Sequence, residues 1–218
     1  MVFGKRKAAE PRVEVVDWRG VREFRLTETV RLKGKGRRKP EVGRLAVRVP
    51  TGDPEDPVLA PCAFFAPHVA APVAASRVYR DEDAREVLLS VEKRKQPDGE
   101  VRHLVSDEDG VEVGLIRRIP PATRLHRHNW RMAQAGRPEI VAHHVRSRQR
   151  QGIVMDALGS ALGASAGEGG DFAKLARTLE WRADEEHVMT SRTFDAVVIE
   201  ADWLDRRLAI AFAMLLDR

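Results

Sequence analysis

The chain has 218 residues, of which 43% are hydrophobic and 33% charged, and its formal net charge is +5. This composition predicts a folded protein with room for one large β domain or two small ones, and it excludes a largely disordered chain. The single cysteine, Cys62, excludes a disulfide within the chain. Because it lies in the apolar run Cys62-Ala-Phe-Phe, we expect a packed thiol in a reducing compartment.

The basic residues are concentrated in the first quarter of the chain. Residues 1–50 carry 15 Lys or Arg and 6 Asp or Glu, a net charge of +9, and the remainder has a net charge of −4. This asymmetry favours a polyanionic partner, although solvation of an exposed arm explains it equally well. No apolar stretch follows the charged N-terminus and no window approaches eighteen apolar residues, so we expect neither a secretory signal nor a membrane span.

After a flexible basic leader at residues 1–12, the pattern predicts short strands joined by turns. The expected strands are 13–16, 24–32, 44–49, 86–93, 101–105, 111–118, 125–133, 139–146 and 194–199. The Ala- and Pro-rich stretch 59–75 stays open between strand and irregular structure.

The centre of the chain has the clearest pattern. Pro97-Asp-Gly99 and Asp109-Gly110 separate three strand-like runs, and Asp-Gly is favoured in tight hairpin turns because both residues tolerate positive φ. We therefore expect a β-meander over 86–118. Arg80-Asp-Glu-Asp-Ala-Arg-Glu-Val87 is echoed 26 residues later by Ser106-Asp-Glu-Asp-Gly-Val-Glu-Val113, which is either a duplicated hairpin or chance.

Two segments indicate helices. Residues 153–162 have helical spacing of apolar residues, followed by a flexible Gly- and Ala-rich stretch at 163–170. Residues 208–216 are apolar without a break, so this helix must be surrounded by protein, and its length of about 14 Å is too short to cross a bilayer. Asp202 and Asp205 are placed for the N-cap and the third helical position. The fold class we predict is a closed antiparallel β-barrel enclosing a hydrophobic C-terminal helix, with one additional helical segment near 152–163.

The phrase Asp107-Glu-Asp-Gly-Val-Glu-Val-Gly-Leu-Ile-Arg-Arg118 resembles the repeated hairpins of the tubby C-terminal-like superfamily, which includes the phospholipid scramblases and the LURP-one-related proteins. The closing phrase Trp203-Leu-Asp-Arg-Arg-Leu-Ala-Ile-Ala-Phe-Ala-Met-Leu-Leu-Asp217 is similar to the central helix of that fold. The resemblance covers about residues 75–218, and it implies one twelve-stranded barrel domain, here 13–218, wrapped around its last helix. It implies no single chemistry: tubby-type members bind phosphoinositides through basic residues, and scramblases are associated with lipid movement. No lipid-binding motif matches residue by residue.

The best candidate for a functional site is a basic loop with two glycines. Its charged residues are Lys33, Lys35, Arg37, Arg38 and Lys39. Clustered Lys and Arg suit phosphates or acidic headgroups, at about 1 kcal/mol per residue near an anionic surface. The alternative is an exposed hairpin tip kept soluble by its charge. No P-loop pattern is present.

Other clusters have simpler interpretations. His126 and His128 would share one face of a strand, whereas His143 and His144 would not, and no further ligand completes a metal site. The acidic triplets 81–83 and 107–109 fail the EF-hand pattern and are typical of turns. Ser160, Ser165 and Ser191 have no nucleophile-elbow context, and Trp18, Trp130, Trp181 and Trp203 are expected as core or barrel-end anchors. We assign no catalytic, cofactor-binding or metal-binding residue.

These observations predict a cytoplasmic, non-enzymatic binding protein, peripheral to the membrane, that docks on anionic lipid headgroups through the basic loop and uses no cofactor. Two alternatives stay open: a nucleic-acid-binding protein using the same basic arm, and a protein-interaction scaffold using the apolar face of residues 153–170.

Overall fold

The computed structural model describes residues 13–31, 40–53, 57–67, 76–121, 128–145, 178–192 and 196–215. Within these ranges the chain is mainly β, with twelve strands, a short 3-10 helix (Trp18–Gly20) and one α-helix, α1 (Arg206–Leu215). The strands are β1 (Glu23–Arg31), β2 (Glu41–Thr51), β3 (Val58–Phe64), β4 (Arg77–Tyr79), β5 (Val87–Lys95), β6 (Val101–Ser106), β7 (Glu112–Ile119), β8 (Asn129–Ala133), β9 (Ile140–His144), β10 (Thr178–Ala183), β11 (Glu186–Arg192) and β12 (Val197–Ile199).

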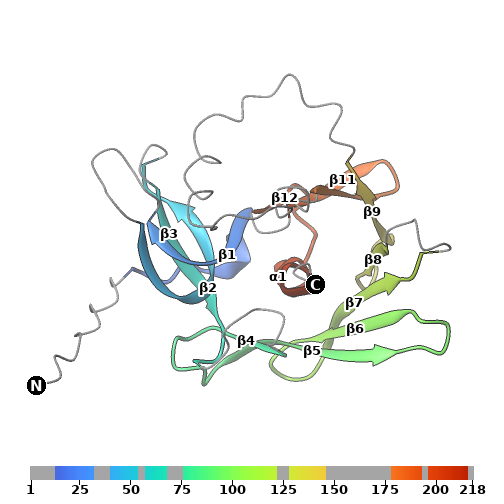
Figure 1. The fold of residues 1–218 in the computed structure, drawn as a ribbon, viewed down its shortest axis with the longest axis horizontal. Coiled ribbons are helices and arrows are strands. Elements are labelled where there is room, and N and C mark those ends of the chain that lie inside the picture. The colour runs from blue at the N-terminus through green and yellow to red at the C-terminus, as the bar shows by residue number, and fades with distance from the viewer. Residues whose placement is uncertain are drawn as a thin grey trace, which may run out of the picture.

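The twelve strands form a closed antiparallel barrel, which confirms the predicted fold class at this level (Figure 1). Each strand pairs with its neighbours in sequence, and the ring closes where Glu23 of β1 pairs with Val198 of β12. Among the described strands, closure therefore leaves no free sheet edge, the usual site of unwanted strand pairing. The barrel is irregular at β1, because Arg31 also pairs with Val58 of β3.

The predicted meander corresponds to β5, β6 and β7, which pair in sequence order. Gly99 and Gly110 adopt φ values of +84° and +79° at the two turns, a conformation that glycine reaches without steric cost. The turn residues therefore set the register of these hairpins.

The expected strand at 13–16 is wrong. One main-chain hydrogen bond attaches it to β3, from Val16 N to Pro61 O at 2.9 Å. Pro61 has no N–H to return a second bond, so a ladder cannot propagate there. The leader 1–12, the helix expected near 152–163, and residues 68–75 lie outside the described residues.

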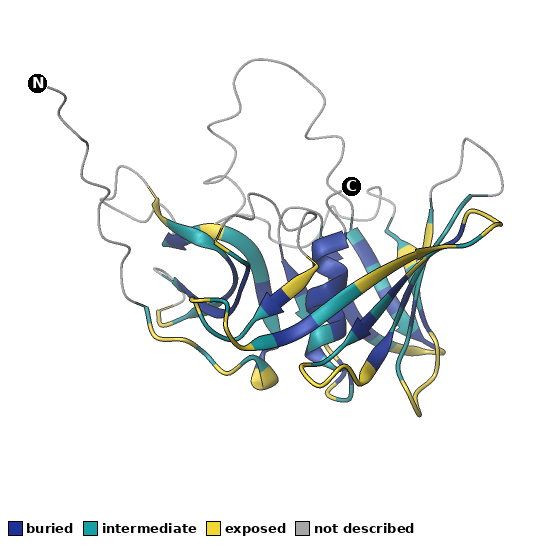
Figure 2. Ribbon diagram, turned by 90° about the horizontal axis from the view of Figure 1, so that it is seen from below, coloured by how far each residue is buried: buried dark blue, intermediate teal, exposed yellow. Residues whose placement is uncertain are grey.

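Nine of the ten residues of α1 are buried, Arg207 being the exception (Figure 2). The helix contacts β5, β6, β7 and β12, and Phe212 packs edge-on against Trp130 of β8 and Trp181 of β10, at ring-centroid distances of 5.3 and 4.4 Å. Burial of each large apolar side chain stabilises the folded state by about 1.5–3 kcal/mol relative to leaving it exposed. The apolar run from Leu208 to Leu215 is therefore explained by the burial of each of these residues.

The start of α1 differs from expectation. The helix begins at Arg206, so Asp205 is its N-cap rather than its third residue, and Asp205 Oδ1 accepts a hydrogen bond from Arg207 N at 2.9 Å. Asp202 lies in the preceding turn, where its carboxylate pairs with Arg22 at 2.5 Å.

Candidate functional site

The five basic residues singled out in the sequence, 33–39, lie outside the described residues, but their attachment to the barrel is defined. Arg31, the last residue of β1, pairs directly with Glu41, the first residue of β2. Their side chains form an ion pair of 3.7 Å between Arg31 Nε and Glu41 Oε2. The basic segment therefore joins two neighbouring strands at one end of the barrel.

The ring order fixes which connections share that end. Because sequence neighbours are paired and antiparallel, the connections that follow β1, β3, β5, β7, β9 and β11 leave from one end, which we call the β1–β2 end. The connections that follow β2, β4, β6, β8, β10 and β12 leave from the other, which we call the β6–β7 end. The antiparallel pairing of Arg31 with Val58 is an exception to this simple order, because it places the last residue of β1 beside the first residue of β3.

A group of basic side chains lies on the wall of the barrel near the β1–β2 end. Arg118 of β7 pairs in register with Trp130, whose ring packs on α1, so both lie on the face of the wall that contacts α1. The Arg118 guanidinium lies 5.9 Å from the centre of the Trp130 ring, and its Nη2 is 3.5 Å from His128 Nδ1. His144 Nε2 lies 3.4 Å from the main-chain oxygen of His128. This group offers guanidinium and imidazole nitrogens, the chemistry that suits a phosphate or carboxylate.

Three of the four histidines considered as metal ligands lie within the described residues. His126 lies outside the described residues, and His128 precedes β8, which begins at Asn129. His143 is exposed and His144 is half-buried, as alternation along β9 requires. Among the described residues no group of three or more His, Cys, Asp or Glu side chains is arranged to hold a metal ion.

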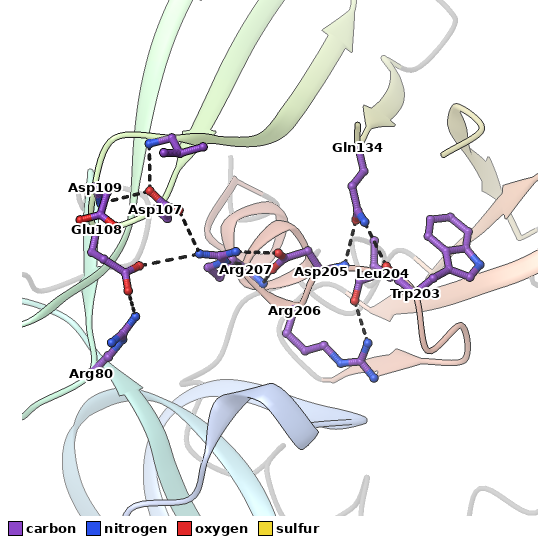
Figure 3. A network of polar contacts seen from close by, with 11 residues as sticks. Arg80, Asp107, Glu108, Asp109, Gln134, Trp203, Leu204, Asp205, Arg206 and Arg207 are labelled. Carbon is purple, nitrogen blue, oxygen red and sulfur yellow. Dashed lines mark hydrogen bonds and ion pairs between the residues drawn. The ribbon is translucent and has the colours of Figure 1, made fainter. Parts of the chain in front are cut away.

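At the β6–β7 end, an ion-pair network fastens the start of α1 to the barrel (Figure 3). Arg207 Nη2 lies 2.8 Å from Asp205 Oδ2, and Arg207 Nη1 lies 3.7 Å from Asp107 Oδ2 and 3.8 Å from Glu108 Oε2. Glu108 also pairs with Arg80 of the β4–β5 turn. The two echoed turns are thus joined to each other and to the helix.

In each acidic triplet, the first aspartate accepts hydrogen bonds from main-chain amides of its own turn. Asp81 Oδ1 accepts hydrogen bonds from the amides of Arg85 (3.0 Å) and Glu86 (2.6 Å), and Asp107 Oδ1 accepts from the amide of Val111 (2.9 Å). Side-chain capping of this kind explains acidic residues at turns without a bound cation.

A row of arginines lies on the outer face of the barrel, and the sequence did not predict it. Arg94, Arg102, Arg117 and Arg131 are successive register partners across β5, β6, β7 and β8. Like charges at directly opposite positions destabilise a sheet unless counter-charges separate them. Only the pairing register reveals this row, because the four residues have no common spacing in the sequence.

Carboxylates neutralise that row. Glu100 accepts from Arg102 Nε at 2.6 Å and from Arg117 Nη2 at 2.8 Å, and Glu139 accepts from Arg131 Nη1 at 2.6 Å. The hydrogen bonds from Arg117 and Arg102 lower the pKa of Glu100 to about 2. The row is therefore a structural ion-pair ladder that ties β6, β7 and β8 together.

The candidate nucleophiles form no catalytic arrangement within the described part of the chain. Cys62 is 1% exposed, and burial raises the pKa of its thiol to about 12. Ser191 is buried and its hydroxyl accepts a hydrogen bond from Trp181 Nε1 at 3.0 Å. Ser160 and Ser165 lie outside the described residues.

Comparison of the chain with protein-family models, with curated proteins and with solved structures finds no match. In the described ranges, no helix has both the length and the apolar character needed to cross a bilayer.

Proposed function

We propose that the chain is a non-enzymatic binding protein of the tubby-like kind that docks on anionic lipid headgroups from the cytoplasmic side. The residues that would contact the headgroups are Lys33, Lys35, Arg37, Arg38 and Lys39. The barrel would act as a rigid scaffold, with electrostatic attraction as the driving force.

A protein of the tubby-like kind would have its last helix enclosed by the barrel. In this proposal the barrel wraps α1 on all sides, as the resemblance to the tubby-like fold implies. Support comes from the burial of nine α1 residues, from the α1 contacts with β5, β6, β7 and β12, and from the Phe212 contacts with tryptophans on β8 and β10. The projection in Figure 1, with α1 inside the outline of the strands, agrees with it.

One observation carries the binding proposal. The connection from β1 to β2, residues 32–40, contains five basic residues and no acidic residue. A hairpin tip needs few charges to stay soluble, whereas five would contribute about 5 kcal/mol near an anionic surface if each contributed fully. The basic side chains of Arg118 and His128 lie toward the same barrel end.

Co-sedimentation of the full chain with vesicles tests the proposal. We expect binding to vesicles that contain phosphatidylserine and none to pure phosphatidylcholine, with affinity that falls as salt increases. Changing all five loop residues to glutamine should abolish binding. The matched control neutralises five basic residues that precede β1, namely Lys5, Arg6, Lys7, Arg12 and Arg19.

The outcomes separate the alternatives. Binding that is unchanged at high salt, or after neutralising the loop, contradicts the proposal. Loss of binding only in the control variant would show that the basic residues preceding β1, and not the loop, contact the lipid headgroups. A DNA duplex that binds more tightly than vesicles and is not displaced by them would indicate a nucleic-acid-binding protein.

A further inference from the structure

The sheet formed by β5 to β8 has a different charge pattern on each of its two faces. On the outer face, carboxylates separate the arginines of the row described above, and Glu100 accepts hydrogen bonds from two of them. On the face that contacts α1, one row of register partners crosses the same four strands, and it consists of Lys95, Val101, Arg118 and Trp130. The two charged members of this second row are both cations, so it is not an ion-pair ladder of the outer kind.

Further basic side chains lie on the same face beside this row. Lys93 and His103 are opposite each other in the neighbouring row. His144 of β9 pairs with Leu179, which lies two residues before Trp181, and the Trp181 ring packs on α1. This face therefore gathers guanidinium, ammonium and imidazole groups from neighbouring strands.

The contacts within this group determine which nitrogens donate. A guanidinium has no acceptor, so at 3.5 Å Arg118 Nη2 donates to His128 Nδ1, and His128 carries its proton on Nε2. His144 Nε2 donates to the main-chain oxygen of His128 at 3.4 Å. The Trp130 ring, with its centre 5.9 Å from the guanidinium, holds Arg118 from the other side. Arg118 and His128 are thus held next to each other as hydrogen-bond donors.

This set of donors fits a phosphate monoester better than a carboxylate. A phosphate monoester has three terminal oxygens and a charge of about −1.5 to −2 at neutral pH. The guanidinium fork suits two of these oxygens, and His128 Nε2–H suits the third. Lys95 is exposed on the same row, two strand spacings or about 10 Å from Arg118 between Cα atoms, and adds a second charge. A carboxylate has one charge and two oxygens, and so uses fewer of these donors.

We propose that Arg118 and His128, assisted by Lys95, bind a phosphate monoester on the face of the barrel wall that contacts α1. The site goes beyond the proposed function, because none of its residues belongs to the loop 33–39, and either can fail without the other. A soluble phosphate ester and the headgroup of phosphatidic acid share this chemistry.

The competing explanation is structural. α1 ends at Leu215, three residues after Phe212, and Phe212 contacts Trp130. The same cations are thus placed to stabilise the negative end of the helix dipole. In that case Arg118 would contribute to stability, and no phosphate ester would bind.

Calorimetric titration of the full chain with glycerol phosphate tests the site. We expect Arg118→Gln to weaken binding about tenfold or more, because it removes charge-assisted hydrogen bonds. Arg94→Gln is the matched control, since Arg94 lies on the outer face of the same sheet, where it is hydrogen-bonded to Glu92 and 58% exposed. The control should change binding less than about twofold.

A second variant and a second measurement guard against a folding defect. Lys95→Gln alters an exposed side chain and should weaken binding about threefold with the fold intact, as circular dichroism checks. Glycerol phosphate should also raise the thermal stability of the unaltered chain, and raise that of Arg118→Gln less. If Arg118→Gln lowers stability and the ligand stabilises neither protein, the structural explanation holds and the proposal is overturned.

Vesicles separate the two sources of the phosphate. Phosphatidic acid carries a monoester and phosphatidylserine a diester, each mixed here with phosphatidylcholine. If Arg118→Gln weakens partitioning to phosphatidic acid vesicles and not to phosphatidylserine vesicles, the ligand is the headgroup. An effect confined to glycerol phosphate assigns a soluble ester. Equal effects of Arg118→Gln and Arg94→Gln, or no binding that depends on Arg118 with either monoester, would overturn the proposal.

Discussion

Gly114 of β7 lies directly against Leu208 of α1. A Cβ atom on Gly114 would be 2.9 Å from Leu208 Cδ1 and would also collide with the main-chain oxygen of Ala133 on β8. The wall of the barrel and the helix therefore approach each other as closely as backbone allows at this point. Glycine within a strand is typical of such close approach.

Gly114→Ala should destabilise the protein by about 2 kcal/mol, because the main-chain oxygen of Ala133 cannot move without disturbing the β7–β8 pairing. Chemical denaturation monitored by circular dichroism measures the change in the free energy of unfolding. Gly20→Ala is the matched control, since a Cβ there meets nothing within 4 Å, and it should alter stability by less than about 0.5 kcal/mol. Equal stability of the two variants would contradict the close packing of α1 on β7.

Arg207→Gln should cost about 2 kcal/mol of stability. The change leaves Asp107, Glu108 and Asp205 without the guanidinium that they share, and breaking a largely buried ion pair costs more than breaking an exposed one. Arg85→Gln is the control, because its pair with Asp83 is exposed and should contribute less than about 0.5 kcal/mol. Thermal and urea unfolding at low and high salt measure both. If the two variants lose the same stability, the network does not fasten α1 to the barrel.

The sequence predicts the parts of this fold that depend on local signals. The meander from β5 to β7 follows from alternation and from turn glycines at 99 and 110, and burial of the last helix follows from its unbroken apolar run. Both signals act over a few residues, so no knowledge of distant pairing is needed.

Features that depend on tertiary context could not be predicted. Arg48 alternates with apolar residues and should face solvent, yet it is 2% exposed, and its guanidinium donates to the main-chain oxygens of Thr27, Leu59 and Arg44. The arginine row on β5 to β8 likewise requires knowledge of the pairing register. A register shift of one residue would place every side chain of a strand on the other face.

Stability should depend on pH through Glu100. Its pKa in the folded protein is about 2, below the ordinary value of 4.5, because Arg117 and Arg102 donate hydrogen bonds to its carboxylate. A depressed carboxyl pKa stabilises the fold at pH values above 4.5, and this contribution is lost as the pH falls from 4.5 toward 2.

Glu100→Gln should therefore reduce the free energy of unfolding by about 2 kcal/mol at neutral pH, and the difference from the unaltered protein should shrink toward pH 2. Urea denaturation at a series of pH values measures this difference. Glu92→Gln is the control, since its pair with Arg94 is about 60% exposed on both sides and should matter little. A difference for Glu100→Gln that stays constant with pH would refute the role of its charge.

Cys62 should resist thiol reagents as long as the protein is folded. Its side chain is 1% exposed, and burial raises its pKa from 9.0 to about 12, so at neutral pH both access and the reactive thiolate are lacking. The rate of reaction with Ellman's reagent should then follow opening of the barrel and rise with urea in parallel with unfolding. Two comparisons complete the measurement: the chain in strong denaturant, which should react at once, and Ala135→Cys, whose added thiol at an exposed turn should react in the folded state. Rapid modification of Cys62 in the native protein would mean that the β3 wall opens without global unfolding.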